Sequence, residues 1–189
     1  MRKRLSLPYL GCVSIFVLVV VLIPLLINTK VRQVDSLQSV SYSREDFIEM
    51  VAPDIVKVAK SYGIKPSIVI AKAAIDSEYG ETLLSQKYHN LYHIKATGRE
   101  HSVSLKTSDE QYVVTYKVYK TWRSSIYDYF GKIKDGSVGR KKFYVYLISQ
   151  KNYKDMTSIM ESYNGDGSKT YAKRLIEVVK AYQLTQYDK

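Results

Sequence analysis

The sequence has a single cysteine among its 189 residues, and that scarcity excludes several kinds of chemistry. Cys12 has no partner for an internal disulfide, so a folded domain must be stabilised by its own hydrophobic core. The residues that follow Cys12 also offer no thiol nucleophile and no cysteine metal site. Internal repeats and low-complexity tracts are absent as well, so the length favours one ordinary domain with an appendage.

Charge is missing from one long stretch near the N-terminus. Residues 9–28, YLGCVSIFVLVVVLIPLLIN, carry no charged side chain, and their number matches a hydrocarbon core of roughly 30 Å. We predict a transmembrane helix at 9–28, a basic cytoplasmic tail at 1–8, a linker at 29–42 and an outward-facing domain at 43–189, because Arg2, Lys3 and Arg4 precede the span. A cleaved signal peptide fits less well, since the run is long and ends without a small-x-small site.

Positive charge is in excess beyond the predicted span. Without Arg2, Lys3 and Arg4, 26 basic residues face 18 acidic ones, which is a net charge of +8. This balance suits an anionic envelope polymer or nucleic acid, and it also suits plain solubility and attraction to a cell surface. No nucleic-acid-binding motif accompanies the charge, so we expect no nucleic-acid partner.

Hydrophobic spacing predicts a mostly helical domain interrupted by one small sheet, which is an α+β fold with a helix-rich core. Residues 101–119 alternate with period two around a polar turn at 108–111, which indicates a β-hairpin. The segment 67–79 is apolar nearly all round and should be central and buried. Further helical segments are expected at 43–62, 81–87, 121–133, 141–149, 153–163 and, after a glycine turn, within 165–184.

Two acids, Asp76 and Glu78, stand where the apolar segment runs out before Gly80. Residues two apart on a regular helix point in nearly opposite directions, so both acids face one cleft only if the helix unwinds. A carboxyl group at the end of a buried helix is suited to general acid catalysis, because burial raises its pKa, and sugar-cleaving enzymes use such groups. One acid capping a neighbour and the other pairing with a lysine would also explain the pattern.

The sequence around these acids, IAKAAIDSEYGETLLSQKYHNLYHIKA, resembles the bacterial cell-wall glucosaminidase family. That family carries Ala-x-x-Glu-Ser-x-Tyr/Trp-Gly and, further on, Asn-Leu-Phe-Gly-Ile-Lys. The matching residues are Ala73, Ser77, Tyr79 and Gly80, then Asn90, Leu91, Tyr92, Ile94 and Lys95. The segments VYKTWRSSIYDYF, through Tyr119, and KTYAKRLIEVVKAYQL, through Tyr171, are similar to two more family segments. The resemblance covers nearly all of the outward domain.

The resemblance implies a lysozyme-like helical lobe with a small β-hairpin lobe, and hydrolysis of the β-1,4-linked N-acetylglucosamine–N-acetylmuramic acid backbone of peptidoglycan. The expected protein is a membrane-anchored endo-β-N-acetylglucosaminidase, an autolysin that faces the cell wall, acts on glycan strands and needs no cofactor. Muramidase-type cleavage on the same fold and a catalytically inactive peptidoglycan-binding or division scaffold are the alternatives. The sequence indicates no particular protein partner.

By the same resemblance, the catalytic candidates are Asp76, Glu78, Asp109 and Tyr119, and the substrate-binding candidates are Tyr79, Asn90, Tyr92, His93, Lys95 and Tyr171. Asp76 stands where the family has the longer glutamate, a change that can cost on the order of a hundredfold in rate. We expect Asp76 to be the acid. Glu78 is the alternative acid if the helix unwinds at Tyr79 and Gly80, and a domain that binds glycan without cutting it is the third possibility.

The second catalytic group is expected on the hairpin. Asp109 is the candidate carboxylate, although it could serve only as a turn residue, and a substrate-assisted route through the acetamido group would need no second carboxylate. Tyr119 is expected to point its hydroxyl into the cleft from the polar face of the hairpin.

Two histidines raise the question of a metal site. His89 and His93 are four residues apart, but the residues between them lack the glutamate of His-Glu-x-x-His and no third ligand stands out. We therefore expect no metal. His93 replaces a glycine of the family pattern, which would alter the shape or the pH response of the cleft.

Overall fold

A computed structural model of the chain describes residues 42–106, 112–163 and 170–189. All of these belong to one compact unit. The predicted transmembrane helix, cytoplasmic tail and most of the linker lie outside the described residues. Within the described part, no helix has the length and apolar character needed to cross a bilayer.

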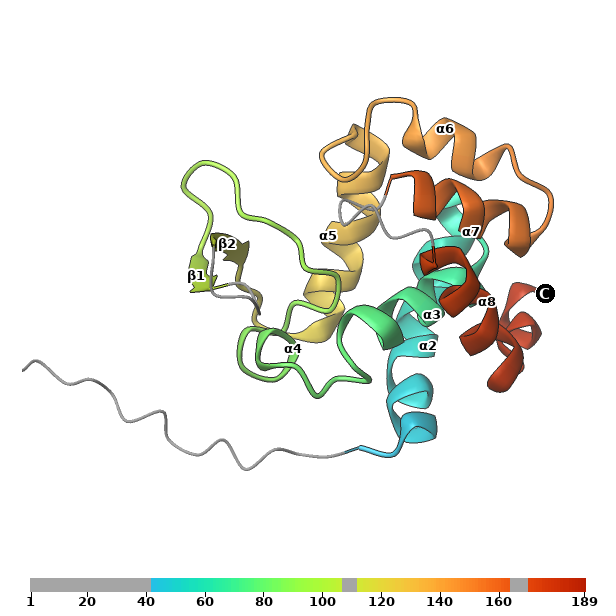
Figure 1. The fold of residues 1–189 in the computed structure, drawn as a ribbon, viewed down its shortest axis with the longest axis horizontal. Coiled ribbons are helices and arrows are strands. Elements are labelled where there is room, and N and C mark those ends of the chain that lie inside the picture. The colour runs from blue at the N-terminus through green and yellow to red at the C-terminus, as the bar shows by residue number, and fades with distance from the viewer. Residues whose placement is uncertain (1–41, 107–111, 164–169) are drawn as a thin grey trace, which may run out of the picture. The chain divides into compact units, whose positions relative to one another are not determined.

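The order of elements confirms the α+β class, with one two-stranded antiparallel sheet in a mostly helical unit. Figure 1 shows the hairpin set apart from the gathered helices. The elements are α2 (Arg44–Tyr62), α3 (Pro66–Asp76), α4 (Leu83–Tyr88), β1 (Ser102–Lys106), β2 (Val113–Lys117), α5 (Trp122–Asp135), α6 (Phe143–Ile148), α7 (Tyr153–Ser162), α8 (Tyr171–Ala181) and a 3₁₀ helix η1 (Leu184–Asp188).

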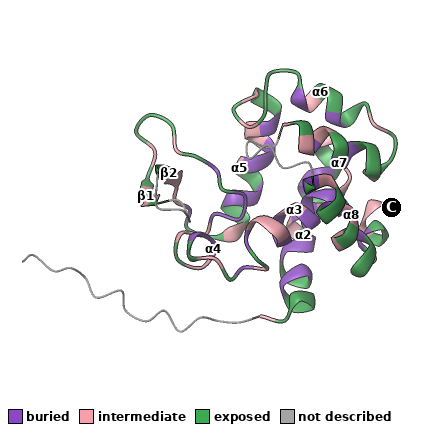
Figure 2. Ribbon diagram, in the orientation of Figure 1, coloured by how far each residue is buried: buried purple, intermediate pink, exposed green. Residues whose placement is uncertain are grey.

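Helix α3 is the central helix, as its apolar sequence predicts. Eight of its residues are buried, among them Ile68, Val69 and Ile70, and Figure 2 shows this helix buried over much of its length. Helices α2, α7, α8 and η1 all pack against it. Because α3 has no exposed face of its own, its C-terminal end is held firmly by the surrounding elements.

The N-terminus of α3 is capped from the far end of the chain. Lys65 makes no side-chain cap, and Asp188 supplies one instead by accepting the backbone N–H of Ser67 at 2.9 Å and its hydroxyl at 2.8 Å. A carboxylate at this position satisfies a free helix N–H and complements the positive end of the helix dipole. Helix η1, which the sequence pattern did not predict, therefore fixes the start of α3.

The other end of α3 differs from the prediction. The helix ends at Asp76, three residues before the expected Tyr79, because Glu78, Tyr79 and Gly80 adopt left-handed φ angles of 51°, 57° and 86°. Ser77 stabilises this turn: its hydroxyl donates to the carbonyl of Ala73 at 2.6 Å and accepts the N–H of Gly80 at 2.9 Å. The turn removes Glu78 from the helical register.

The hairpin forms the predicted small lobe. Strands β1 and β2 pair with Val103 opposite Tyr116 and Ser104 opposite Thr115, and Lys95 forms an isolated bridge to Tyr116. The turn that joins the strands, including the candidate Asp109, lies outside the described residues.

We predict that Gly80→Ala destabilises the domain more than Gly98→Ala. A Cβ atom at Gly80 would lie 3.0 Å from ring atoms of both Phe47 and Trp122, in addition to the left-handed strain, whereas one at Gly98 would carry the strain in open space. We expect losses in the free energy of unfolding of about 2–3 kcal/mol for Gly80→Ala and about 1 kcal/mol for Gly98→Ala. Urea denaturation followed by circular dichroism measures both, and equal losses would contradict the packing argument.

Candidate active site

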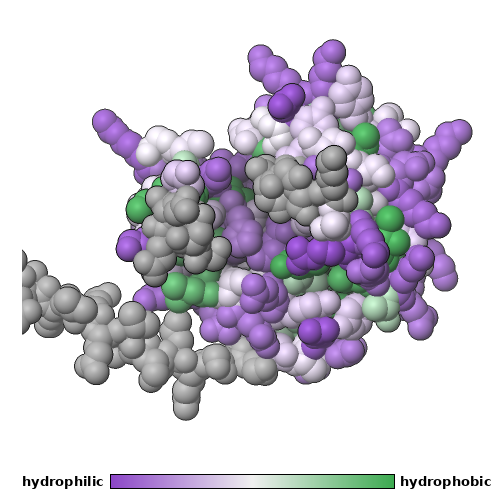
Figure 3. All heavy atoms as spheres, in the orientation of Figure 1, coloured by the Kyte–Doolittle hydropathy of each residue, from purple (hydrophilic) through white to green (hydrophobic). Residues whose placement is uncertain are grey.

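A groove of about 710 Å³ lies between the hairpin lobe and the helical lobe. Its lining comes from the end of α3, the loop after α4, strand β2, helix α5 and the facing parts of α7 and α8. Figure 3 shows hydrophilic residues along the surface between the two lobes. Among its described lining residues are Lys72, Asp76, Glu78, Tyr92, His93 and Tyr171.

Asp76 lines the groove at the last turn of α3 and is held by an ion pair. The Nζ atom of Lys72, one turn earlier, lies 2.7 Å from Oδ2 of Asp76, and the two side chains are only 14% and 10% exposed. Tyr171 of α8 donates its hydroxyl to Oδ1 at 2.9 Å, and Lys72 also donates to the Tyr171 oxygen at 3.0 Å. These bonds occupy both oxygen atoms of the Asp76 carboxylate and hold its side chain in one position.

Glu78 also lines the groove, because α3 has already ended before it. Its side chain is exposed, and within the part of the chain that the structure describes its carboxylate has no hydrogen bond or ion pair. The unwinding that we named as the condition for Glu78 to act is therefore present. Both acids reach the same groove, which a regular helix would not permit.

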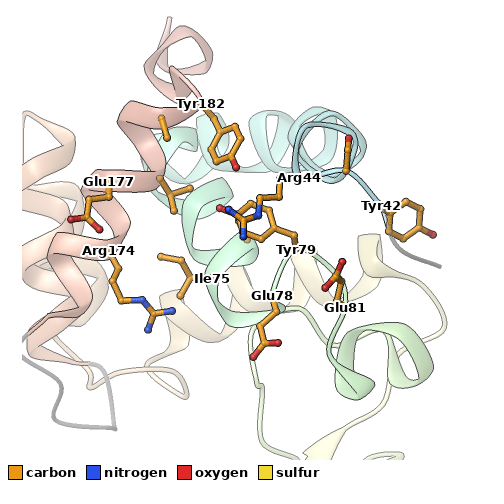
Figure 4. A pocket seen from close by; sticks show the side chains of 13 residues that line it. Tyr42, Arg44, Ile75, Glu78, Tyr79, Glu81, Arg174, Glu177 and Tyr182 are labelled. Atoms are coloured by element: carbon orange, nitrogen blue, oxygen red, sulfur yellow. The ribbon is translucent and has the colours of Figure 1, made fainter. Parts of the chain in front are cut away.

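A second hollow of about 690 Å³ adjoins the groove and shares Ile75, Glu78 and Arg174 with it. In Figure 4, Arg44 of α2 lies beside Tyr79, while Glu78 and Arg174 lie at some distance from that pair. The Arg44 guanidinium is 4.9 Å from the Tyr79 ring centroid.

Tyr79, a predicted substrate-binding residue, lines this second hollow and is not among the residues of the groove. Its ring centroid lies 5.9 Å from that of Tyr182. Burial, followed by a hydrogen bond with Tyr182, raises the pKa of Tyr79 to about 12. The phenol is therefore uncharged and able to donate a hydrogen bond at neutral pH.

Four of the predicted substrate-binding residues do line the groove: Tyr92, His93, Lys95 and Tyr171. Tyr92 is 5% exposed and stacks on Tyr129, with ring centroids 4.2 Å apart, and its burial raises the pKa of the phenol. The pKa of His93 is lowered, chiefly because surrounding atoms desolvate the ring, although Asp76 acts in the opposite direction. His93 is therefore neutral at pH 7, and its charge change falls at lower pH.

Asn90 does not line the groove and instead builds the loop beside it. Its side chain is 1% exposed, and its Nδ2 atom donates to the carbonyl oxygens of Ile94 and Lys117, both at 2.9 Å. Its Oδ1 atom accepts the N–H of Ile94 at 3.0 Å. Asn90 therefore ties the loop that carries Tyr92 and His93 to the end of β2.

Tyr119 also lies outside the groove lining. It is 8% exposed, and its hydroxyl donates to Oδ2 of Asp128 on α5 at 2.6 Å. Strand β2 presents the other set of alternating residues to the groove, Val114 and Tyr116. Burial, together with Asp128, raises the pKa of Tyr119, so its phenol serves as a neutral support for the hairpin lobe.

A network of charges braces that lobe. The Nζ atom of Lys117 on β2 lies 2.9 Å from Oδ2 of Asp128 and 2.6 Å from Oε1 of Glu100. The same Glu100 oxygen lies 3.7 Å from Nζ of Lys132, a residue that lines the groove. The bond from Lys117, followed by the N–H of Thr97, lowers the pKa of Glu100 to about 2. The ionised form of Glu100 is therefore the one that the folded lobe stabilises.

We predict that this network weakens the fold in acid. The pKa of Glu100 in the folded state, about 2, is below its ordinary value of 4.5, so its contribution is present above pH 4.5 and is lost as the pH falls towards 2. The melting temperature of the parent should therefore fall more between pH 4.5 and 2 than that of Glu100→Gln. Glu49→Gln, on an exposed position of α2, is the matched control and should follow the parent. Identical pH dependence in all three proteins would show that the network contributes nothing.

Several groove residues escaped prediction, among them Lys72, Tyr116 and Lys132. Lys72 could have been found from its spacing, because residues four apart on a helix lie on the same face and Lys72 and Asp76 carry opposite charges. Tyr116 was missed because the wrong face of the hairpin was assigned to the cleft. Lys132 belongs to α5, for which no sequence signal indicated a role in the groove.

A protein-family model described as mannosyl-glycoprotein endo-beta-N-acetylglucosaminidase matches residues 52–184. The chain is 24% identical over 171 residues to the exo-glucosaminidase LytG of Bacillus subtilis, covering 87% of this chain and 58% of that protein. It is 29% identical over 163 residues to a "Probable N-acetylmuramidase" of Lactococcus lactis subsp. cremoris, covering 80% of this chain and 36% of that protein. The chain thus spans 58% of the length of the first of these curated relatives and 36% of the length of the second.

Among solved structures, the catalytic domain of the autolysin Auto from Listeria monocytogenes has a similar fold. The TM-score is 0.63 with 23% sequence identity, and the match covers 99% of this chain and 100% of that one. This similarity confirms the predicted lysozyme-like architecture of helices with a small sheet.

Proposed function

The chain belongs to the mannosyl-glycoprotein endo-beta-N-acetylglucosaminidase family, and from that premise we propose that it is a peptidoglycan hydrolase that cleaves the β-1,4 glycan backbone in the groove. The observation that carries this proposal is that Asp76 and Glu78 line one groove between the two lobes. Glycoside hydrolysis needs two such functions at the scissile bond, one group that protonates the leaving oxygen and one that stabilises positive charge on the sugar.

The groove is suited to a sugar polymer. Tyr92, Tyr116 and Tyr171 line it, and tyrosine rings offer flat apolar faces together with hydroxyl groups that bond to sugars. The second hollow adjoins the groove at Ile75, Glu78 and Arg174, so the two cavities together offer a larger binding surface. A larger surface favours a strand of several sugars over a small substrate.

We further propose that the bond cut is the one that leaves N-acetylglucosamine at the new reducing end, which is the cleavage of an N-acetylglucosaminidase. Cleavage on the other side of the repeat, as in a muramidase, would use the same carboxyl groups with the strand shifted by one sugar. The apolar run at 9–28 supports a second part of the proposal, a membrane anchor that keeps the domain at the outer face of the membrane.

We predict that the full-length protein clears a zymogram of purified peptidoglycan, and that Asp76→Asn and Glu78→Gln each reduce the rate at least about a hundredfold. A positioned acid or base contributes about 10²–10⁴-fold, which sets this magnitude. Asp54→Asn is the matched control, because Asp54 pairs with exposed Arg123 and lines neither cavity. Failure of the parent to clear under any condition would favour the glycan-binding scaffold instead.

The same digests identify the bond. Reduction of the released fragments with borohydride, followed by mass analysis, should place reduced N-acetylglucosamine at the new ends. Reduced N-acetylmuramic acid at those ends would establish muramidase-type cleavage and overturn this part of the proposal.

A further inference from the structure

Given the proposed glycan cleavage, on which this inference rests, we propose that Glu78 is the general acid, in place of Asp76, which the resemblance implies. Asp76, fixed by Lys72, acts as a carboxylate that faces the sugar, and Glu78 gives its proton to the bridging oxygen. Lys72 is thereby assigned a role as a positioning residue that acts through Asp76.

Both oxygen atoms of Asp76 are already occupied as acceptors. Oδ2 faces the Lys72 ammonium at 2.7 Å and Oδ1 accepts the Tyr171 hydroxyl at 2.9 Å. A general acid needs an O–H group directed at the leaving oxygen, and protonating Asp76 would leave Lys72 beside a neutral carboxyl group. Breaking a largely buried ion pair from one side is unfavourable, so Asp76 is poorly placed to carry the proton.

Lys72 is held as firmly as its partner. Its Nζ atom lies 5.2 Å from the Tyr171 ring centroid and 5.8 Å from that of Tyr129, distances at which an aromatic face attracts a cation. Its side chain is 14% exposed. The lysine therefore cannot leave Asp76 for water without losing these contacts as well.

Apart from the two acids, the ionisable groups that line the groove in the described part of the chain are neutral or positively charged. From the loop after α4, Tyr92 and His93 are neutral at pH 7, because burial raises the pKa of the phenol and desolvation lowers that of the imidazole. Tyr129 of α5 has a raised pKa for the same reason, and Tyr163 contributes a phenol from the end of α7. The cations that line the groove together with Lys72 are Lys95, Lys132 and Arg174. Asp76 and Glu78 are therefore the two acidic side chains among the described groove-lining residues.

Glu78 has the opposite setting. It is the remaining acid among the described groove-lining residues, it is exposed, and it has no ion pair within them. A sugar in the groove would meet this carboxyl group directly, because no described residue bonds to it. The side chain is also one methylene longer than that of Asp76.

The proposed step balances with water alone. Glu78 transfers its proton to the bridging oxygen while the bond from that oxygen to the anomeric carbon breaks, and the electron pair stays on the oxygen. The anomeric carbon becomes positively charged and is stabilised by ionised Asp76. Water then adds to that carbon, and the proton that it loses restores the Glu78 carboxyl group.

The decisive variant is Lys72→Met, because the two assignments predict opposite changes in the pH profile of kcat/KM. If Asp76 must be ionised, removing the lysine should move the acidic limb of the profile upward by about one pH unit or more. The reason is that an opposite charge at this distance typically lowers the pKa of a carboxyl group by about 1–3. If Asp76 were the donor, the alkaline limb would move upward instead and activity at neutral pH would rise. That second result would overturn the proposal.

Two controls separate charge from structure. Lys72→Arg keeps the charge and should restore most of the parent profile. Lys173→Met removes an exposed lysine of α8 that lies 3.9 Å from Glu177, and it should leave the profile unchanged.

A direct observation of the ion pair tests the assignment even if Lys72→Met fails to fold or the parent cleaves nothing. Nitrogen-15 spectra of the full-length parent in detergent should show the Lys72 ammonium exchanging its protons with water far more slowly than the exposed ammonium of Lys173, because Lys72 is 14% exposed and paired with Asp76. Exchange as fast as that of Lys173 would overturn the inference, whereas a protected Lys72 ammonium in a protein that cleaves nothing would overturn only the proposed hydrolysis.

Discussion

The run of left-handed residues at Glu78, Tyr79 and Gly80 is the constraint on which the groove depends. Two of these residues carry side chains and each costs about 1–2 kcal/mol in this conformation, so the turn persists only because its surroundings fix it. The Ser77 hydroxyl bonds to both sides of the turn, and Gly80 packs where no Cβ would fit comfortably against Phe47 and Trp122. Without this turn α3 would continue, and Glu78 would follow the helical register away from Asp76.

Rigid elements on both sides make this turn useful. On the helical side, α3 is buried among four other helices and capped by Asp188 from the end of the chain. On the hairpin side, Asn90 ties the loop to β2, and the ion pairs among Lys117, Asp128 and Glu100 join the sheet to α5. The side chains that line the groove are thus carried by elements whose positions are fixed elsewhere, which preorganises the site.

The sequence predicted the elements well and the site only in part, and the reason is physical. Hydrophobic periodicity reports which faces are buried, so the central position of α3, the hairpin and the helices at its flanks could all be found. The end of α3 could not be found in this way, because neither glutamate nor tyrosine is a residue type that is typical of left-handed turns. Tyr119 was misplaced because the alternation along β2 defines two faces of the hairpin but does not show which face lines the groove. Asn90 was found through a motif, and a motif does not distinguish a residue that binds substrate from one that builds the loop beside it.

The lysine beside Asp76 gives the shortened acid a physical context. A glutamate in place of Asp76 would extend one methylene further from α3, whereas aspartate stays within reach of Lys72 one turn back and of Tyr171 on α8. Shortening the side chain therefore favours an internal ion pair over projection into the groove. A carboxylate that is drawn back in this way gives up the reach that proton transfer needs. In the proposed assignment, the turn after α3 supplies that reach through Glu78, so the same stretch of chain that departs from the family pattern also contains the group that compensates for the departure.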